Sequence, residues 1–529
     1  MRRSLLRRLL SITSLAGFLS LIASCSAPGW SGSSSDPSCS RVPLTAAIAP
    51  LSVKPSSSEV ASYNASVDAL LSSLLKKYPA SALQGIVECE GRSIVIDAGK
   101  SELLQLDPRD FDDISIIRKP EGGDQVHHLV RRDGVGIPVV MKQNYRAAKA
   151  STKKLFPLNG RHLPASAVID TDREGRLVLR FHHTRNVEDA VVAGHVRSLA
   201  YDLSTPLQRS MGGKSQEIAL QGLINSDRYL DDTGIYLPDV YDPAKIPVVF
   251  VHGLKSDPHI WQNAMNEVLR DPVLRKKYQC WYFLYPTGLP VYASAAKLRR
   301  MLYIARDHYD PQHRNPQMNR MVLVGHSMGG LLSRMQTIDS KDEIYNAFFT
   351  RPLDELALKP LTKSLIEDSM VFERVPFVKR TVYVAAPHQG SSVAQVPVVR
   401  AFGMLVNPTN NLDAVTMDIR MHAHDDLHPE LRKFHNMGCR SVQTLSPQHP
   451  ILKSIQKRPM QVPCHSIIAR AQKNRELRET SDGVVAYWSS HVHQAQSELV
   501  VNGTHSCTRL PEVSAEILRI LRLHLGQSH

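Results

Sequence analysis

Residues 321–330 read Met-Val-Leu-Val-Gly-His-Ser-Met-Gly-Gly, and this stretch decides the expected fold. Its apolar start is typical of a buried strand, and residues 331–335 continue as a helical run. Between them, Gly325-x-Ser327-x-Gly329 has the pattern of a sharp strand-to-helix turn, in which glycines relieve collisions beside the central residue. Such a turn holds the serine hydroxyl out into a cleft, so we predict that Ser327 is a nucleophile.

A second informative stretch, residues 248–254, reads Val-Val-Phe-Val-His-Gly-Leu and predicts a buried strand that ends in His-Gly-Leu. A His-Gly pair alone is ordinary in loops, but it is more telling at the end of the first strand of such a unit. An acyl-transfer serine needs main-chain donors for its oxyanion, because an unsatisfied anion in a dry cleft is costly. We expect the N–H groups of Leu254 and Met328 to be these donors.

Around both stretches, buried strands alternate with amphipathic helices, the pattern of a parallel α/β sheet. The expected strands are residues 247–251, 280–285, 321–324, 380–385, 462–469 and 498–501, and the expected helices are 293–307, 329–338 and 513–523. Two long stretches, 339–373 and 389–460, interrupt the alternation and are expected to lie as insertions over the carboxyl edge of the sheet. We therefore predict an α/β domain over residues 241–529.

These motifs resemble the α/β-hydrolase family, particularly its bacterial lipases and esterases, over about half of the chain. The family orders its triad as serine, acid, histidine. Residues 480–490, Thr-Ser-Asp-Gly-Val-Val-Ala-Tyr-Trp-Ser-Ser, resemble the stretch with the acid, and residues 502–505, Asn-Gly-Thr-His, resemble the loop with the base. Residues 381–391 resemble the sixth-strand segment, although Ala386 replaces a threonine. The resemblance implies Asp482 and His505 as partners of Ser327, an α/β-hydrolase fold with helical caps, and no metal or organic cofactor.

Chemical reasoning from the residues agrees with this assignment. A serine needs a base to take its proton, and a carboxylate to orient the imidazole. Asp482 and His505 each follow an expected strand, which places both at the carboxyl edge with Ser327. Two competing acids, Asp413 and Asp418, fall inside the second insertion. That insertion also contains a polar cluster that could bind a metal, although a solvated loop is the better interpretation: His422, His424, Asp425, Asp426 and His428.

The preceding residues, 59–240, predict an accessory mixed α+β domain. Apolar residues at helical spacing predict a helix over 60–75. Short β-branched runs predict strands at 93–96, 137–141, 167–170 and 176–181, the last two joined by a hairpin turn at 172–175. The chemistry of this part is not readable from its residues.

The N-terminus predicts export and lipid anchoring. Residues 1–24 have a basic start and an apolar run that ends in Ile22-Ala23-Ser24-Cys25, which resembles a bacterial lipobox. A plain secretory signal, or a cysteine there by chance, is the alternative. Lipidated Cys25 and a Ser/Pro-rich tether over 25–58 would place the protein at the cell envelope, where we expect the outer membrane. Six further cysteines could form disulfides there, but their pairing is not readable: Cys39, Cys89, Cys280, Cys439, Cys464 and Cys507.

The composition is that of a globular protein, with 42% hydrophobic and 22% charged residues in 529. The net charge of +14 is scattered, which gives nucleic-acid binding little support. We expect a serine esterase or lipase that acts on an ester or lipid substrate. Apolar residues of the second insertion, between 393 and 405, would suit a lipid or simply pack the cap. The alternatives are an envelope acyltransferase, an amide-lipid deacylase, or a catalytically silent anchored binding protein.

Overall fold

The computed structural model describes residues 51–89, 91–97, 99, 101–119, 126–144, 150–223, 225–391, 410–436 and 441–526. All of the elements below belong to one compact unit, Ala47–His529. The expected signal segment, Cys25, Cys39, Cys439 and most of the tether lie outside the described residues.

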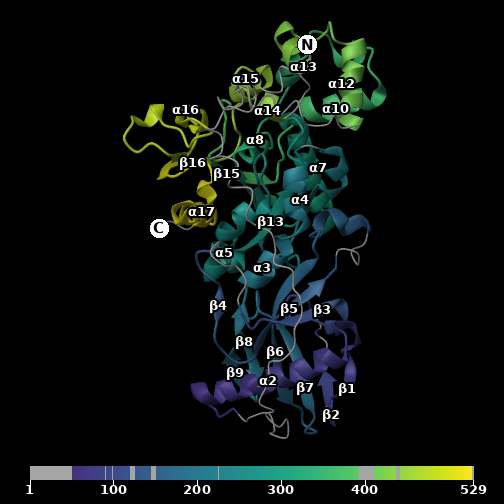
Figure 1. Cartoon of the computed structure of the whole chain (residues 1–529), viewed down its shortest axis with the longest axis vertical. Coiled ribbons are helices and arrows are strands. Elements are labelled where there is room, and N and C mark those ends of the chain that lie inside the picture. The colour runs from purple at the N-terminus through teal and green to yellow at the C-terminus, as the bar shows by residue number, and fades with distance from the viewer. Residues whose placement is uncertain are drawn as a thin grey trace, which may run out of the picture. The chain divides into compact units, whose positions relative to one another are not determined.

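The chain from residue 234 onward builds a seven-stranded sheet in the order β11-β13-β12-β14-β15-β16-β17 (Figure 1). The strands are β11 (Gly234–Tyr236), β12 (Ile246–Val251), β13 (Tyr278–Leu284), β14 (Met321–His326), β15 (Val378–Val384), β16 (Cys464–Arg470) and β17 (Ser497–Asn502). Only β11 runs antiparallel to its neighbour, and the other pairs are parallel. The six strands expected from the sequence are confirmed, with ends shifted by two residues or fewer.

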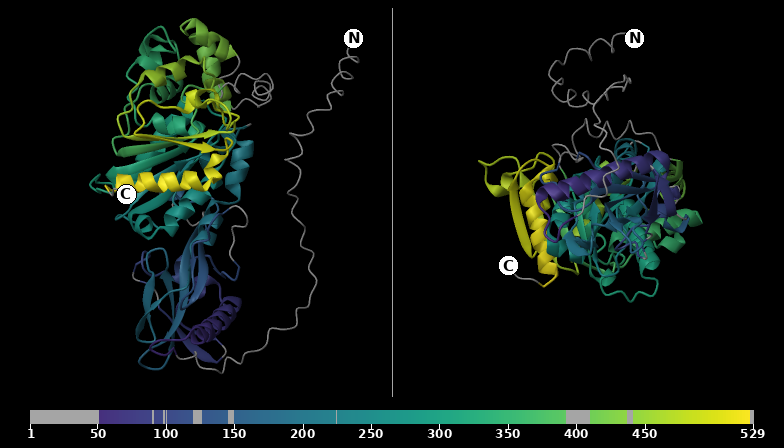
Figure 2. Two further views of the ribbon diagram at one scale, coloured as in Figure 1. Left: turned by 90° about the vertical axis from the view of Figure 1, so that its left-hand side faces the viewer. Right: turned by 90° about the horizontal axis from the view of Figure 1, so that it is seen from below.

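The central strands are buried on both faces, because alternate side chains enter two different cores. Val249 and Val251 of β12 pack with α7 (Val291–Tyr309) and α8 (Met328–Arg334). Val248 and Phe250 pack instead with the helices on the other face, which are α3 (Ser204–Met211), α5 (Gln262–Arg270), α6 (Pro272–Lys277) and α17 (Pro511–His524). Figure 2 shows α17 lying along its side of the sheet. The result is a three-layer helix–sheet–helix arrangement, as the apolar runs predict.

The helix after Ser327 ends earlier than expected, at Arg334 instead of residue 338. Its end tightens into three-residue turns, in which Gln336 N–H donates to the Ser333 carbonyl and Thr337 N–H donates to the Arg334 carbonyl. The Gln336 side chain also donates to the carbonyls of Ala295 and Leu332, so it competes with a further helical turn.

Both insertions contribute helices beyond the carboxyl ends of the strands (Figure 1). The first contains α9 (Glu343–Asn346) and α10 (Pro360–Met370), and the second contains α12 (Asn410–His422), α13 (Pro429–Asn436), α14 (Ser441–Thr444) and α15 (Pro450–Lys457). They contact each other, since the Asp418 carboxylate accepts from the Lys359 N–H at 2.9 Å. The apolar residues expected between 393 and 405 lie outside the described residues.

A second sheet, of six strands in the order β1-β2-β7-β6-β5-β3, precedes the large one. Its strands are β1 (Gly85–Cys89), β2 (Arg92–Ile96), β3 (Asp113–Ile116), β5 (Ile137–Gln143), β6 (Arg161–Thr171) and β7 (Leu177–His183). The expected helix is α2 (Ser57–Lys77), whose Tyr63 hydroxyl donates to the Ile169 carbonyl of β6 at 2.7 Å. The expected hairpin is also present, since β6 and β7 pair antiparallel across the turn.

Segments that precede residue 240 in the chain connect the two sheets, because they pack against the large sheet. Strand β11 and helix α3 precede the expected domain boundary at residue 240, yet they pack within the core of the large sheet. The segment 126–130 lies against α5, where His127 N–H donates to the Asn263 side chain at 3.0 Å. Ser204 joins the same contact, because its hydroxyl donates to Asn266 at 2.7 Å and accepts from Val130 N–H at 2.8 Å.

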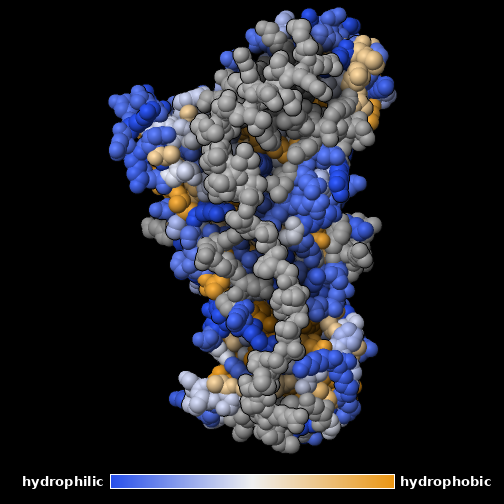
Figure 3. All heavy atoms as spheres, viewed as in Figure 1, coloured by the Kyte–Doolittle hydropathy of each residue, from blue (hydrophilic) through white to orange (hydrophobic). Residues whose placement is uncertain are grey.

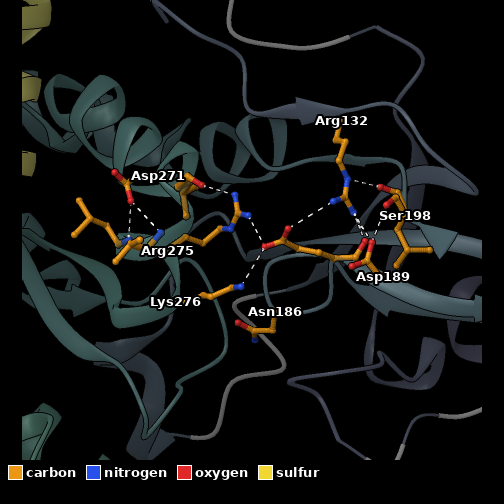
Figure 4. A network of polar contacts seen from close by, with 12 residues as sticks. Arg132, Asn186, Asp189, Ser198, Asp271, Arg275 and Lys276 are labelled. Carbon is orange, nitrogen blue, oxygen red and sulfur yellow. Dashed lines mark hydrogen bonds and ion pairs between the residues drawn. The ribbon is translucent and has the colours of Figure 1, made fainter. Parts of the chain in front are cut away.

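Ionic contacts reinforce this link (Figure 4). Glu188 precedes β8 (Asp189–Val192), and its carboxylate accepts from Arg275 of α6 at 2.7 Å. Arg132 approaches the other carboxylate oxygen of Glu188 at 3.5 Å. Arg275 also donates to the Leu269 carbonyl, so its guanidinium is held between the two regions. This arrangement lowers the pKa of the Glu188 carboxyl, chiefly through the hydrogen bond from Arg275.

Candidate active site

Ser327 lies at the turn between β14 and α8, in a backbone conformation that side chains rarely adopt. Its φ is 53° and its ψ is −127°, which is the strain expected of a nucleophile turn. The neighbouring glycines make this turn possible. A Cβ on Gly325 would lie 2.4 Å from the Gly329 carbonyl oxygen, and a Cβ on Gly329 would lie 2.4 Å from that of Val251. Ser327 is 7% exposed.

His505 lies in the loop after β17, which is separated from β14 in the sheet by β15 and β16. Its side chain nevertheless reaches Ser327. Its Nε2 is 2.8 Å from the Ser327 hydroxyl oxygen, and its Nδ1 is 2.7 Å from Asp482 Oδ2. The main-chain N–H of His505 donates to the Asp482 carbonyl at 3.0 Å. The structure therefore brings together the three side chains that the sequence indicated, at distances that allow a proton to pass between serine and imidazole.

Asp482 is buried in the loop after β16, and its two oxygens have different partners. Oδ1 accepts from the N–H groups of Val484 and Val485, at 2.8 and 2.7 Å. Oδ2 is thereby left to His505 Nδ1. An acceptor at this place selects the tautomer of His505 that has its proton on Nδ1, which leaves Nε2 free to accept from Ser327.

The two expected oxyanion donors come from different parts of the chain, since Met328 directly follows Ser327 and Leu254 follows Gly253 in the loop after β12. Met328 follows Ser327 at the first position of α8, where main-chain N–H groups have no partner inside the helix. Gly253 lies against Ser327, because a Cβ built on it would be 2.8 Å from the Ser327 Cβ. Neither the Leu254 nor the Met328 N–H donates to another group of the described chain. Oxyanion binding requires main-chain amides of this kind, which have no partner within the protein.

Two buried histidines next to the site were not singled out from the sequence. Burial lowers the pKa of His252 to about 4 and that of His326 to about 3, so both rings are neutral near pH 7. His252 stacks on Tyr285 with ring centroids 4.5 Å apart. His326 Nε2 lies 2.8 Å from the carbonyl oxygen of His505. The only sequence signal for His326 was its position inside the Gly-x-Ser-x-Gly motif, directly before Ser327.

The remaining sequence candidates lie away from these groups. Asp413 and Asp418 both belong to α12, and Asp418 binds His422 and the Lys359 N–H instead of the site. In the part of the chain that the structure describes, no group of three histidine, cysteine or acidic side chains is arranged to hold a metal ion. The thiols of Cys280, Cys464 and Cys507 are buried and form no disulfide.

Exposed apolar side chains lie on the insertions. Leu361 and Leu365 of α10 are 66% and 42% exposed, and Met417 and Met421 of α12 are 51% and 61% exposed. Figure 3 shows hydrophobic atoms at the outer side of this region, at the upper right. No helix within the described ranges is both long and apolar enough to cross a bilayer.

Comparison with known proteins supplies fold-level likeness alone. No protein-family model and no curated protein matches the chain. Among solved structures, it is similar to the mature form of a Bacillus licheniformis lipase (16% identity, 53% of this chain and 94% of that chain, TM-score 0.31). It is also similar to Staphylococcus hyicus lipase (14%, 53% and 96%, TM-score 0.34) and to a carboxylesterase of Nitrososphaera gargenis (13%, 56% and 96%, TM-score 0.30).

Two of these neighbours are lipases and the third is a carboxylesterase, and all three are matched at low identity over about half of this chain.

Proposed function

We propose that the chain is a serine hydrolase of the α/β-hydrolase type, an esterase or lipase that cleaves carboxylic esters through an acyl-enzyme. The observation that carries this proposal is the continuous chain of hydrogen bonds from Ser327 through His505 to Asp482, at 2.8 and 2.7 Å. A serine hydroxyl in contact with an oriented imidazole is an activated nucleophile, and backbone strain of the kind seen at Ser327 is typical of functional sites.

The proposed reaction begins when Ser327 Oγ attacks the ester carbonyl while its proton passes to His505 Nε2. The N–H groups of Leu254 and Met328 bind the oxyanion of the tetrahedral intermediate. Asp482 stabilises the imidazolium, which then gives its proton to the departing alcohol as the C–O bond breaks. Water attacks the acyl-enzyme with His505 as base, and the acid product leaves Ser327 with its proton restored. No step needs a metal or organic cofactor.

We further propose that the substrate is a lipid or another apolar ester at the bacterial cell envelope. The lipobox-like residues 22–25 support a lipid anchor on Cys25, which would hold the protein at a membrane. The exposed apolar side chains of α10 and α12 lie on insertions near the carboxyl edge, where an apolar substrate would arrive.

Labelling with a fluorophosphonate probe tests the proposal directly, because the probe reacts only with an activated serine. We expect one labelled residue, Ser327, and loss of both labelling and nitrophenyl-ester turnover in Ser327→Ala. The measurement is mass spectrometry of the labelled peptide, combined with turnover of esters of increasing chain length. A decline in turnover with chain length would contradict the lipid part of the proposal.

Ser294→Ala is the matched control. Ser294 is also buried, on α7, but its hydroxyl has no hydrogen-bond partner among the described residues. We expect this variant to label like the wild type. A wild-type protein that does not label and does not turn over esters would favour the silent binding protein and exclude a hydrolase.

A further inference from the structure

His326 makes a contact that the proposed reaction does not use. Its Nε2 lies 2.8 Å from the main-chain carbonyl oxygen of His505, although the two residues are 179 positions apart in the chain. The two rings are also close, with centroids 4.8 Å apart and planes inclined by 45°. His326 is buried, and Trp261 packs edge-on against its ring.

The chemistry of this contact determines the tautomer of His326. A carbonyl oxygen can only accept, so Nε2 must be the atom that carries the proton. Nδ1 has no hydrogen-bond partner among the described residues, and it faces the bare Cα of Gly253, where a Cβ would come within 3.2 Å. His326 is therefore a neutral donor with a single acceptor, and that acceptor is the residue that carries the base.

Adjacent residues of β14 and the turn thus hold His505 at two points. Ser327 contacts the imidazole of His505, and His326 contacts its carbonyl. The imidazole of His505 therefore cannot leave Ser327 by a movement of its main chain unless the hydrogen bond from His326 also breaks. We infer that His326 is a positioning residue, which holds the main chain of His505 so that its imidazole stays on the Ser327 hydroxyl. This inference rests on the proposed function of the site.

The electrostatics of the surroundings favour an uncharged donor here. The titratable groups that act on His326 through their charge are His505 and His252, which lower its pKa, and Asp482, which raises it. Burial lowers the pKa of His326 to about 3, and the nearby charge of His505 acts in the same direction. A neutral ring can donate to the His505 carbonyl without opposing the positive charge that His505 gains during acyl transfer.

Three substitutions distinguish the hydrogen bond that His326 donates from the packing of its ring. A glutamine in place of His326 puts its amide nitrogen near the position of Nε2, an asparagine puts it near that of Nδ1, and a phenylalanine keeps the ring without a donor. We expect His326→Phe and His326→Asn to label with fluorophosphonate about 100-fold more slowly than the wild type, and His326→Gln to recover to within about fivefold. KM for a nitrophenyl ester should change little, because the contact acts on the base and not on the substrate.

A readout independent of turnover is the downfield proton resonance of the Nδ1–H of His505 in its hydrogen bond to Asp482. We expect it to broaden or shift in His326→Phe and to return in His326→Gln. His449→Phe is the control, since His449 is also buried but lies at the start of α15. Its variant should keep the resonance and the labelling rate, even if its melting temperature falls.

The inference is overturned if His326→Phe keeps both the wild-type labelling rate and the wild-type resonance, or if the glutamine and phenylalanine variants behave alike. Failure of the proposed function looks different, because the wild type would then neither label nor hydrolyse esters. The resonance would still report in that case whether His326 positions His505.

Discussion

At the scale of single residues, the carboxylate of Asp482 binds the main chain of its own loop with one oxygen and the imidazole of His505 with the other. Oδ1 is occupied by two main-chain N–H groups of its own loop, which fixes the plane of the carboxylate. Oδ2 then has one orientation available, toward His505 Nδ1. Because the loop determines which oxygen faces the imidazole, the effect of a substitution at Asp482 on the tautomer of His505 can be predicted.

The substitution Asp482→Asn tests this reasoning. The asparagine oxygen must take the Oδ1 position to accept from Val484 and Val485, so its NH₂ group faces His505. The imidazole then has to accept at Nδ1 and carry its proton on Nε2, where it cannot take the proton of Ser327. We expect kcat/KM for an ester to fall about 10⁴-fold, the loss seen when a triad tautomer is reversed, with an unchanged melting temperature.

Asp418→Asn is the matched control, because Asp418 also binds a histidine through one oxygen and a main-chain N–H through the other. It lies on α12, so we expect turnover close to that of the wild type. Substantial turnover in folded Asp482→Asn would remove Asp482 from the proposed mechanism.

At the scale of elements, the six longer strands of the large sheet were predictable because each contains a run of apolar residues, whereas the short edge strand β11 was not. β11 has three residues, and its place is decided by pairing with β13, far along the chain. The link between the two sheets is of the same kind. It depends on Glu188, Arg275 and the segment 126–130, none of which has a distinctive local pattern.

The variant Glu188→Ala tests this link. Its side chain is 29% exposed, but that of Arg275 is only 4% exposed, so the substitution leaves a buried guanidinium without its carboxylate. We expect the free energy of unfolding to fall by about 1–3 kcal/mol, as measured by chemical denaturation.

Glu355→Ala provides the comparison, since the pair of Glu355 with Arg351 is about half exposed on both sides. An exposed pair of this kind contributes less than about 1 kcal/mol. Equal effects of the two substitutions would show that Glu188 does not hold the two regions together.

At the scale of the whole molecule, burial of imidazoles makes stability depend on pH. Burial is the main cause that lowers the pKa of His326 and His465 to about 3, and that of His252, His449 and His524 to about 4. In the unfolded chain these rings titrate near pH 6.5. Between these values the unfolded state binds more protons than the folded state, so acid favours unfolding.

We therefore expect full stability above about pH 6.5 and a steady loss as the pH falls toward 4. Each such ring contributes up to about 2 kcal/mol of lost stability between pH 7 and pH 5. The sum is a large part of the roughly 5–15 kcal/mol that stabilises an ordinary protein. Chemical denaturation at pH 8, 7, 6 and 5 measures it, and an unfolding free energy that stays constant over this range would contradict the expectation.

The sequence by itself determined the strand-turn-helix unit around Ser327 and six of the seven strands of the large sheet, because these follow from local apolar runs and from glycines at a crowded turn. It also indicated Asp482 and His505, through motifs that resemble a known family. Only the tertiary structure decided that His326 reaches the carbonyl of His505, that residues before 240 complete the large sheet, and that Glu188 meets Arg275. These contacts join segments far apart in the chain, and their free energy exists only once both segments are packed, so no local pattern encodes them.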